Sequence, residues 1–420
     1  MADIKQINRF KDDFFWGASI SAHQVEGNTH NQWTVWELEN AKVKSVQAEY
    51  RISDYAVWDK IKLQAKDPNN YVSGSLANHY KNYKKDFDLL QKMNMNALRF
   101  SIEWSRIEPQ EGVWDDNEIK YYKEYLGELK NRGIEPIVTL FHFTLPTWFA
   151  EKDGFEKRTN VKYYCRFVKK IISELGENIK YIITINEPEI YSFESYYRQD
   201  WPPAKRSLYK LLSVINNLAY AHRQASKIIH KISSDYKVSI AKNSVYFYAG
   251  DNAWLSRFSA AIMRYIQDDY FIKKVIRHCD FLGVNYYFSD RIYGYKIHNQ
   301  DQKLSDLNWS MQPGDIQYVL ERLFFKYKKP IIITENGLAD AEDINRKWWI
   351  TQTLLAMQKA IKNGVKLDGY LHWSLIDNFE WALGKWPRFG LVSIDYKTGE
   401  RKLRTSAIWF GNVIKKIRRG

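Results

Sequence analysis

The sequence has little cysteine and no long uncharged apolar run. Its two cysteines, Cys165 and Cys279, are far apart in 420 residues, so they form neither a disulfide framework nor a metal-ligand motif. No stretch approaches the ~18 uncharged apolar residues of a membrane-spanning helix, and the N-terminal MADIKQINRF lacks the apolar core of a signal peptide. These absences predict a cytoplasmic protein with no metal and no membrane partner.

Acidic residues are fewer than basic ones, 49 against 63, which gives a net charge of +14 and a pI of about 9.3. Such an excess could serve a nucleic acid or an anionic membrane. The basic residues alternate with acidic ones, however, as in residues 81–93, and only the tail 413–420 is locally basic. We therefore expect a solvated basic surface and no nucleic-acid partner.

The chain also lacks a Pro/Gly/Ser-rich linker and any low-complexity segment. Its length exceeds that of most single domains, but single α/β barrels reach it. Short apolar runs bounded by breakers predict eight strands, at residues 14–19, 96–102, 135–142, 181–188, 237–243, 280–287, 330–337 and 368–375. Most of these runs are continuously apolar, which is typical of strands covered on both faces.

Helical patterns lie between these runs. Residues 79–94 place Tyr83, Phe87, Leu90 and Met93 at helical spacing. Similar patterns cover 117–133, 161–176 and 346–364. Eight strands that alternate with helices predict an α/β fold, a single (β/α)₈ TIM barrel domain over residues 1–420.

In such a barrel the active site forms at the carboxyl ends of the strands. Polar side chains converge there, and burying polar groups costs free energy unless they are paired or used. One of them alone would be an ordinary strand end, but the set predicts a functional rim. Its members are Arg99, His142, Asn186, Glu187, Asn285, Tyr287, Glu335 and Trp373.

Two carboxylates on this rim, Glu187 and Glu335, come from different strands and can face each other. A pair of carboxyl groups about 5–5.5 Å apart is what retaining glycoside hydrolysis requires. One attacks the anomeric carbon, while the other protonates the leaving oxygen and later activates water. The nucleophile must stay ionised, for which Arg99 and Tyr287 are candidate neighbours, and the acid needs a raised pKa.

Aromatic residues and a carboxylate lie close together in residues 370–396, which contain Trp373, Glu380, Trp381 and Phe389. Indole faces that stack on a sugar, beside a carboxylate that binds hydroxyls, are typical of a pyranose site. The alternative is a core aromatic cluster beneath a long loop.

The order and spacing of seven motifs resemble glycoside hydrolase family 1, the β-glucosidase/β-galactosidase family, nearly from end to end. The motifs are FFWGASISAHQVEG (14–27), MNMNALRFSIEWSRIEP (93–109), TLFHFTLPTWF (139–149), TINEP (184–188), DFLGVNYY (280–287), ITENG (333–337) and HWSLIDNFEWALG (372–384).

The resemblance implies a retaining β-glycosidase without cofactor, which removes terminal β-glucosyl, and also β-galactosyl or fucosyl, residues from small β-glycosides and short oligosaccharides. It implies Glu335 as the nucleophile and Glu187 as the acid/base, with Arg99, Asn285 and Tyr287 around the nucleophile. The residues implied to hold the sugar are Gln24, His142, Asn186, Trp373, Glu380, Trp381 and Phe389.

Some positions refine or depart from the family pattern. Glu187 is a true glutamate, which disfavours the thioglucosidase variant, and Glu380, Pro387 and Phe389 replace the Ser, Lys and Tyr of the 6-phospho-glycosidase branch. Phe143 stands where most members have Trp, so one donor to the sugar is missing. Residues 192–207 lack the usual glycines, and residues 244–270 and 287–310 are expected to be short.

Two alternatives use the same barrel. The first is a carbohydrate-binding protein that has lost catalysis, which would typically lack one of the two glutamates. The second is an enzyme that acts mainly by transglycosylation, with the same residues and a sugar or alcohol in place of water.

Overall fold

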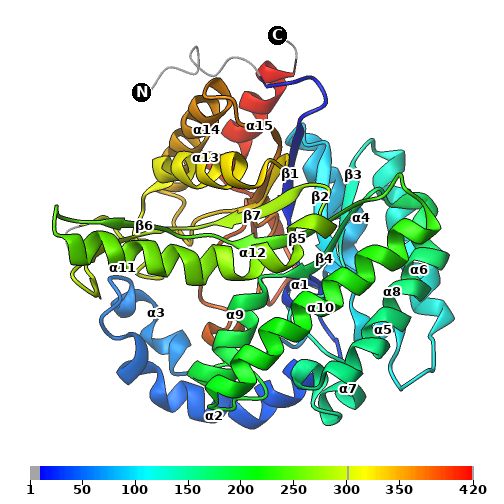
Figure 1. Ribbon diagram of the computed structural model, residues 1–420. Coiled ribbons are helices and arrows are strands. Elements are labelled where there is room, and N and C mark those ends of the chain that lie inside the picture. Colours follow the sequence, from blue (N-terminus) through cyan, green and yellow to red (C-terminus); the bar gives the residue numbers. More distant parts are fainter. Residues whose placement is uncertain (1–9, 300–301, 419–420) are drawn as a thin grey trace.

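The computed structural model describes residues 10–299 and 302–418, and at its centre eight parallel strands close into a barrel (Figure 1). Each strand pairs with its neighbours in chain order, and β1 closes the ring against β11. All eight predicted strands are confirmed. They are β1 (Phe15–Ser19), β2 (Ala97–Ser101), β3 (Glu135–Thr139), β4 (Tyr181–Asn186), β5 (Lys237–Asn243), β7 (Leu282–Tyr286), β10 (Ile331–Asn336) and β11 (Leu367–Trp373).

The strands are continuously apolar because both of their faces are covered. One set of side chains, which includes Ile137, Ile183 and Ile332, forms a separate buried cluster, while alternate residues such as Ile182 and Ile333 belong to the main core with the helices. Burial on both faces removes each strand from water, as the sequence pattern predicts.

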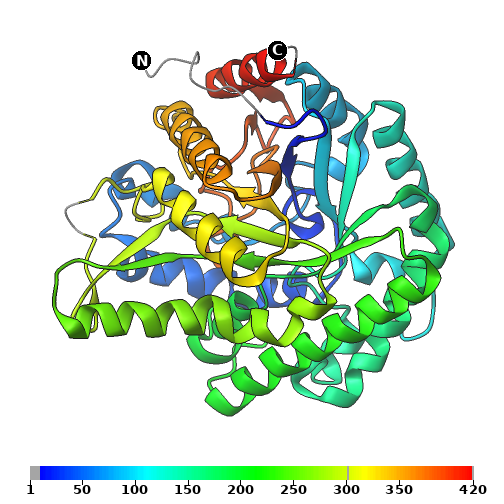
Figure 2. The ribbon, with the colours of Figure 1, turned by 45° about the horizontal axis from the view of Figure 1, so that its top comes forward.

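Helices cover the outside of the barrel (Figures 1 and 2). The four predicted helices are confirmed as α4 (His79–Lys92), α6 (Asp116–Asn131), α8 (Val161–Leu175) and α14 (Arg346–Lys362). The other longer helices are α2 (Gln32–Ile52), α10 (Leu208–Ile232), α11 (Trp254–Arg264), α13 (Ile316–Tyr327) and α15 (Thr405–Ile417). The shorter ones are α1 (Ala22–Val25), α3 (Trp58–Ala65), α5 (Trp104–Ile107), α7 (Thr147–Glu151), α9 (Pro188–Phe193) and α12 (Tyr270–Val275).

Two small sheets were not predicted. A three-stranded sheet contains β6 (Tyr246–Ala249), β8 (Ser289–Tyr293) and β9 (Lys296–Ile297), and α11 packs on it. A second pair, β12 (Val392–Ile394) and β13 (Arg401–Leu403), precedes α15. The first sheet and α11 lie in segments 244–270 and 287–310, which were expected only to be short. These segments form their own small hydrophobic cluster.

Six strand ends were predicted too late, by one to three residues, and three of these bear on site residues. β3 ends at Thr139, so His142 lies three residues beyond it. Glu187 follows directly after β4, and Tyr287 follows directly after β7. The reason is that apolar character continues past the last ladder hydrogen bond, since these loop residues are buried as well. Within residues 10–299 and 302–418, no helix is long and apolar enough to cross a membrane. The single domain over residues 1–420 stays a prediction.

Candidate active site

A cavity of about 710 Å³ opens at the carboxyl ends of the barrel strands. The structure brings all the predicted sugar-binding residues, both glutamates and Tyr287 to its wall. These lining residues are Gln24, His142, Asn186, Glu187, Tyr287, Glu335, Trp373, Glu380, Trp381 and Phe389. Arg99 and Asn285 do not line the cavity, but both are buried and contact its carboxylates.

Glu335 is the next-to-last residue of β10 and is 3% exposed. Arg99 donates to its Oε1, and the Tyr287 hydroxyl donates to its Oε2 at 2.5 Å. Burial raises the pKa of Glu335 above its ordinary value, while the charge of Arg99 and the hydrogen bond from Tyr287 oppose that rise. The expected ionising neighbours are therefore in contact with the carboxylate, but they act against a desolvation cost that the sequence did not predict.

Glu187 follows β4 in a left-handed conformation, with φ of 39°. Its backbone N–H donates to the Ala241 carbonyl at 2.8 Å, and this bond holds the turn against β5. Burial, followed by the negative charge of Glu335, raises the pKa of Glu187 to about 7. Glu187 has no Arg partner comparable to Arg99, so it can hold a proton near neutral pH.

Two adjacent strands, β5 and β7, place amides beside these carboxyl groups. Asn243 on β5 pairs in register with Asn285 on β7, which in turn pairs with Glu335 on β10. Both amides donate to Glu187 Oε1, Asn285 at 2.7 Å and Asn243 at 3.2 Å. Asn285 was expected to support the nucleophile. It lowers the pKa of Glu335, but its hydrogen bond at 2.7 Å is to Glu187.

Arg99 connects the nucleophile site to a neutral histidine. Its Nη2 donates to Asn186 Oδ1 at 2.7 Å, so the Asn186 amide nitrogen is left to face His142 Nε2 at 3.2 Å. Burial and the charge of Arg99 hold the pKa of His142 well below its ordinary value. The neutral ring accepts at Nε2 and thus carries its proton on Nδ1. Among the described residues this buried Nδ1 has no partner, and His142 lines the cavity.

Aromatic rings form the rest of the wall. The His142 ring is nearly parallel to Trp373 and Trp381, at 17° to each and with centroids 6.0 and 6.2 Å away. Gln24 donates to the Phe379 carbonyl at 2.7 Å, which fixes its amide. Burial raises the pKa of Glu380 to about 8, and its Oε2 accepts from Asn378 at 3.1 Å. A flat polar ligand would meet ring faces and hydrogen-bonding groups together.

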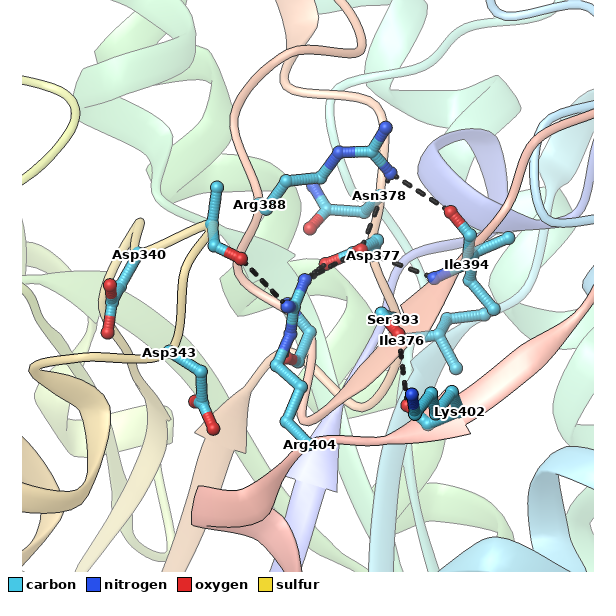
Figure 3. A network of polar contacts seen from close by, with 12 residues as sticks. Asp340, Asp343, Ile376, Asp377, Asn378, Arg388, Ser393, Ile394, Lys402 and Arg404 are labelled. Atoms are coloured by element: carbon cyan, nitrogen blue, oxygen red, sulfur yellow. Dashed lines mark hydrogen bonds and ion pairs between the residues drawn. The ribbon is translucent and has the colours of Figure 1, made fainter. Parts of the chain in front are cut away.

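A charged clamp holds the loop that presents Glu380, Trp381 and Phe389. In Figure 3, Asp377 lies between Arg388 and Arg404. Arg404 Nη2 donates to both Asp377 oxygens, at 3.0 and 2.9 Å, and Arg388 Nη1 reaches the same carboxylate at 3.4 Å. Asp377 also accepts from the Gly390 N–H at 3.0 Å. The loop is therefore tied at both of its ends.

Some lining residues were missed by sequence reasoning. Tyr50, Trp201, Phe288 and Trp309 lie in unpatterned segments, so no sequence signal placed them in the cavity. Asn243, in contrast, is the last residue of a correctly predicted strand, and the strand-end rule would have included it. Among the described residues, no group of three or more His, Cys, Asp or Glu side chains has the arrangement of a metal site.

Comparison with known proteins gives concordant results. The sequence model of glycosyl hydrolase family 1 matches residues 6–279 and 256–418. Beta-glucosidase A of Thermotoga maritima is 27% identical, over 97% of this chain and 98% of that protein. Among solved structures, a beta-glycosidase from Pyrococcus horikoshii has a TM-score of 0.85 at 32% identity, covering 97% of this chain and 95% of the other.

A beta-glucosidase from Thermotoga maritima, solved in complex with glucoimidazole, has a TM-score of 0.86 at 25% identity and covers 98% of this chain and 99% of its own. The sequence alignment with Beta-glucosidase A spans 462 positions, more than the 420 residues of this chain. That relative therefore carries insertions that this chain lacks. Whether they fall at 244–270 and 287–310 stays a prediction.

Proposed function

The chain belongs to glycosyl hydrolase family 1, and from this membership and the cavity's geometry we propose how it acts as a retaining β-glycosidase. Its substrates are small β-glycosides and short oligosaccharides with a terminal non-reducing β-D-glucosyl residue, and also β-galactosyl or fucosyl residues. The proposal rests mainly on one observation: two carboxyl groups in one cavity have different partners and different protonation. Glu335 is paired with Arg99, whereas Glu187 has a pKa of about 7.

In the first step the Glu335 carboxylate attacks the anomeric carbon and forms an ester bond to the sugar. The glycosidic carbon–oxygen bond breaks, and Glu187 gives its proton to the leaving oxygen. Arg99 and Tyr287, which contact the two oxygens of Glu335, orient the carboxylate for this attack. Two carboxyl groups with opposite tasks need separated pKa values, and their different partners supply that separation.

In the second step Glu187, now a carboxylate, takes a proton from water, and the resulting nucleophile attacks the same anomeric carbon. The ester bond to Glu335 breaks, and the sugar leaves with its β configuration restored. When Glu335 forms the ester it loses its negative charge, and the pKa of Glu187 falls, because that charge is one of the causes of the raised pKa. The pKa of Glu187 rises again when the ester breaks and the charge returns to Glu335.

The residues of the cavity wall offer the sugar both hydrogen-bonding groups and aromatic ring faces. His142 offers a neutral ring, Gln24 and Asn186 offer amides, and Glu380 offers a carboxyl group that burial keeps protonated to about pH 8. Trp373 and Trp381 provide ring faces. Glu380, Pro387 and Phe389 stand where the 6-phospho-glycosidase branch has Ser, Lys and Tyr, so an unphosphorylated sugar is the better fit.

Neither alternative gains support. A carbohydrate-binding barrel without catalysis is not favoured, because both carboxyl groups lie in the cavity with their partners. No observation favours transglycosylation over hydrolysis. Analysis of the reaction products distinguishes the two. The cytoplasmic location stays a prediction.

The test is turnover of β- and α-linked nitrophenyl glucosides and galactosides, with NMR detection of the first sugar anomer released. We expect release from the β-linked substrates only, with the β anomer appearing first. Release of the α anomer first would contradict the double displacement. No turnover on any β-glycoside would instead support the binding protein.

A further inference from the structure

The outer face of α11 is apolar although it is exposed. Trp254, Phe258 and Ile266 are 73%, 55% and 61% exposed, and Leu255, Ile262 and Tyr265 are exposed as well. Residues 254, 258, 262 and 266 recur at the spacing of one helix face, which continues from α11 into the π-helical turn η7 (Tyr265–Asp269). The helix contacts the chain through its opposite side, where Ser256 and Ala260 are buried. Its apolar side therefore points away from the core.

The β8–β9 hairpin extends this apolar area. The Gly294 N–H donates to Ser256 Oγ at 2.7 Å, so the hairpin turn lies against the first turn of α11. Beside that turn, Tyr295 is 75% exposed and Ile297 on β9 is 50% exposed. We call these eight exposed residues the α11 face: Trp254, Leu255, Phe258, Ile262, Tyr265, Ile266, Tyr295 and Ile297. Figures 1 and 2 both show α11 at the margin of the molecule.

Most charges around the α11 face are positive, apart from the exposed Asp251 three residues before Trp254. Residues 254–266 contain Arg257 and Arg264 and no acidic residue. Lys273 Nζ lies 4.9 Å from the Tyr265 ring centroid, and Lys296 Nζ lies 5.7 Å from that of Tyr295. The next two acidic residues are turned inward: Asp268 and Asp269 are buried and form ion pairs with Arg322. Cations thus border the apolar stripe.

We propose that the α11 face is a docking surface for an anionic lipid bilayer. A helix lying in the membrane plane buries one apolar side among the headgroups, with Trp and Tyr at the boundary and Lys or Arg against acidic lipids. Trp254, Tyr265 and Tyr295 supply the boundary side chains, and Arg257, Lys273 and Lys296 supply the cations. The chain's net charge of +14 adds a longer-range attraction to a negative surface.

A bilayer fits this face better than a second copy of the chain does. In a symmetric contact the face meets its own copy, so the mainly cationic border of one α11 face would lie against the mainly cationic border of the other, which is unfavourable. An anionic bilayer instead matches both the apolar stripe and its border. The scattered lysines and arginines of the sequence gave no sign of this surface, which is why no membrane partner was expected. The fold gathers them beside apolar residues from two separate segments.

The α11 face and the cavity are connected through Phe288 but use different residues. Phe288 lines the cavity and also packs against the buried cluster of Val245, Phe247, Ala260 and Ile292 beneath α11. No residue of the α11 face lines the cavity. Docking can therefore be measured separately from turnover of a water-soluble glycoside.

The test is flotation of the full chain with vesicles of phosphatidylglycerol and phosphatidylcholine in equal parts, and with vesicles of phosphatidylcholine alone. We expect binding to the mixed vesicles, weaker binding to the neutral ones, and release from the mixed vesicles as salt is raised. A triple variant, Trp254→Ser, Phe258→Ser and Ile266→Ser, should bind at least about tenfold more weakly while its turnover of a nitrophenyl β-glycoside is unchanged.

A matched control replaces three exposed apolar residues elsewhere, Leu208→Ser, Ile344→Ser and Ile408→Ser, and should bind as the wild type does. Equal weakening in both triple variants would overturn the proposal, as would wild-type protein that floats with neither vesicle. A dimer in solution that the α11 variant alone dissociates, without vesicle binding, would assign the face to a second copy and also overturn it.

Discussion

Near the cavity, charged side chains are buried in or behind its wall, whereas on the α11 face, apolar side chains are exposed. Arg99 and Glu335 are 1% and 3% exposed, and Lys242 on β5 is fully buried between Glu189 and Asp268, at 3.3 and 3.7 Å. Trp254, in contrast, is 73% exposed. Each region departs from the usual division of a folded protein, in which charge faces water and large apolar groups do not.

The buried charges and the exposed apolar residues differ in whether the chain itself supplies their partners. Every buried charge named above has an opposite charge within the chain, because an unpaired ion in the interior is very costly. The side chains of the α11 face remain 38% or more exposed among the described residues, and we propose that a bilayer covers them. Substitutions should therefore disturb the chain's own chemistry at the first region and only its external contacts at the second.

The largest expected effect is at the acid/base. Glu187→Gln should lower kcat/KM for substrates with poor leaving groups by about 10²- to 10⁴-fold, because no proton reaches the leaving oxygen. With a pKa of about 7, wild-type Glu187 is protonated below pH 7, so activity should fall as pH rises through that value. The variant's profile should lack this alkaline limb.

Glu189→Gln is the control for that profile. Burial raises the pKa of Glu189 to about 7 as well, but this side chain does not line the cavity. The alkaline limb should survive in Glu189→Gln. Its disappearance there, or its persistence in Glu187→Gln, would show that another group titrates.

The next effect tests the buried lysine. Lys242→Met leaves Glu189 and Asp268 without their shared cation, so the free energy of unfolding should fall by about 3–5 kcal/mol. The positive charge of Lys242 lowers the pKa of Glu187, so its loss should also move the alkaline limb of activity to higher pH. Denaturant unfolding and a pH profile measure the two effects.

An exposed ion pair is the comparison for this variant. Lys60 pairs with Glu342 at 2.7 Å, and both side chains are more than half exposed. Lys60→Met should leave the unfolding midpoint and the pH profile unchanged. If Lys242→Met behaved in the same way, the buried network would have no role in stability or in acid/base tuning.

A smaller effect is expected at Phe143, which lines the cavity and packs against Trp201 and Trp381 with ring centroids 4.8 and 5.2 Å away. Phe143→Trp adds an indole N–H and should change the ratio of glucoside to galactoside kcat/KM by about two- to tenfold. Phe143→Leu, which adds no donor, separates that effect from packing. Unchanged kinetics in Phe143→Trp would reject the missing-donor account.

The smallest effect is expected on the α11 face. Phe258→Ala should change the free energy of unfolding by less than about 0.5 kcal/mol, because the side chain is exposed. Phe247→Ala, beneath the same helix, removes a buried ring from a cluster and should cost about 3–5 kcal/mol. A similar loss in both variants would mean that Phe258 is part of the core and would remove the contrast between the two regions.

The barrel could be predicted from the sequence because its strands are covered on both faces. Ile331–Ile333, for example, gives a continuous apolar run that exposed strands do not have. α2 was missed for the opposite reason, since its buried residues include Glu37, Lys44 and Ser45 and form no apolar stripe. α11 has an apolar stripe, but periodicity does not tell which side of a helix meets the core.

The site was predictable in its members and less so in its contacts. Strand ends and family motifs predicted Glu187, Glu335 and the residues proposed to bind the sugar, and these residues line one cavity. The bond from Asn243 to Glu187, and the burial that raises the pKa of Glu335, depend on side-chain positions across β5, β7 and β10. No spacing along the chain specifies those positions.

The most direct test of the two catalytic assignments is azide rescue of two variants, Glu335→Gly and Glu187→Gly, on a nitrophenyl β-glucoside. Azide should replace the missing nucleophile in Glu335→Gly and give the α-glucosyl azide. In Glu187→Gly, azide should intercept the ester on Glu335 and give the β-glucosyl azide. The reverse pattern of products, or full wild-type turnover in Glu335→Gly without azide, would contradict the assignment of Glu335 as nucleophile and Glu187 as acid/base.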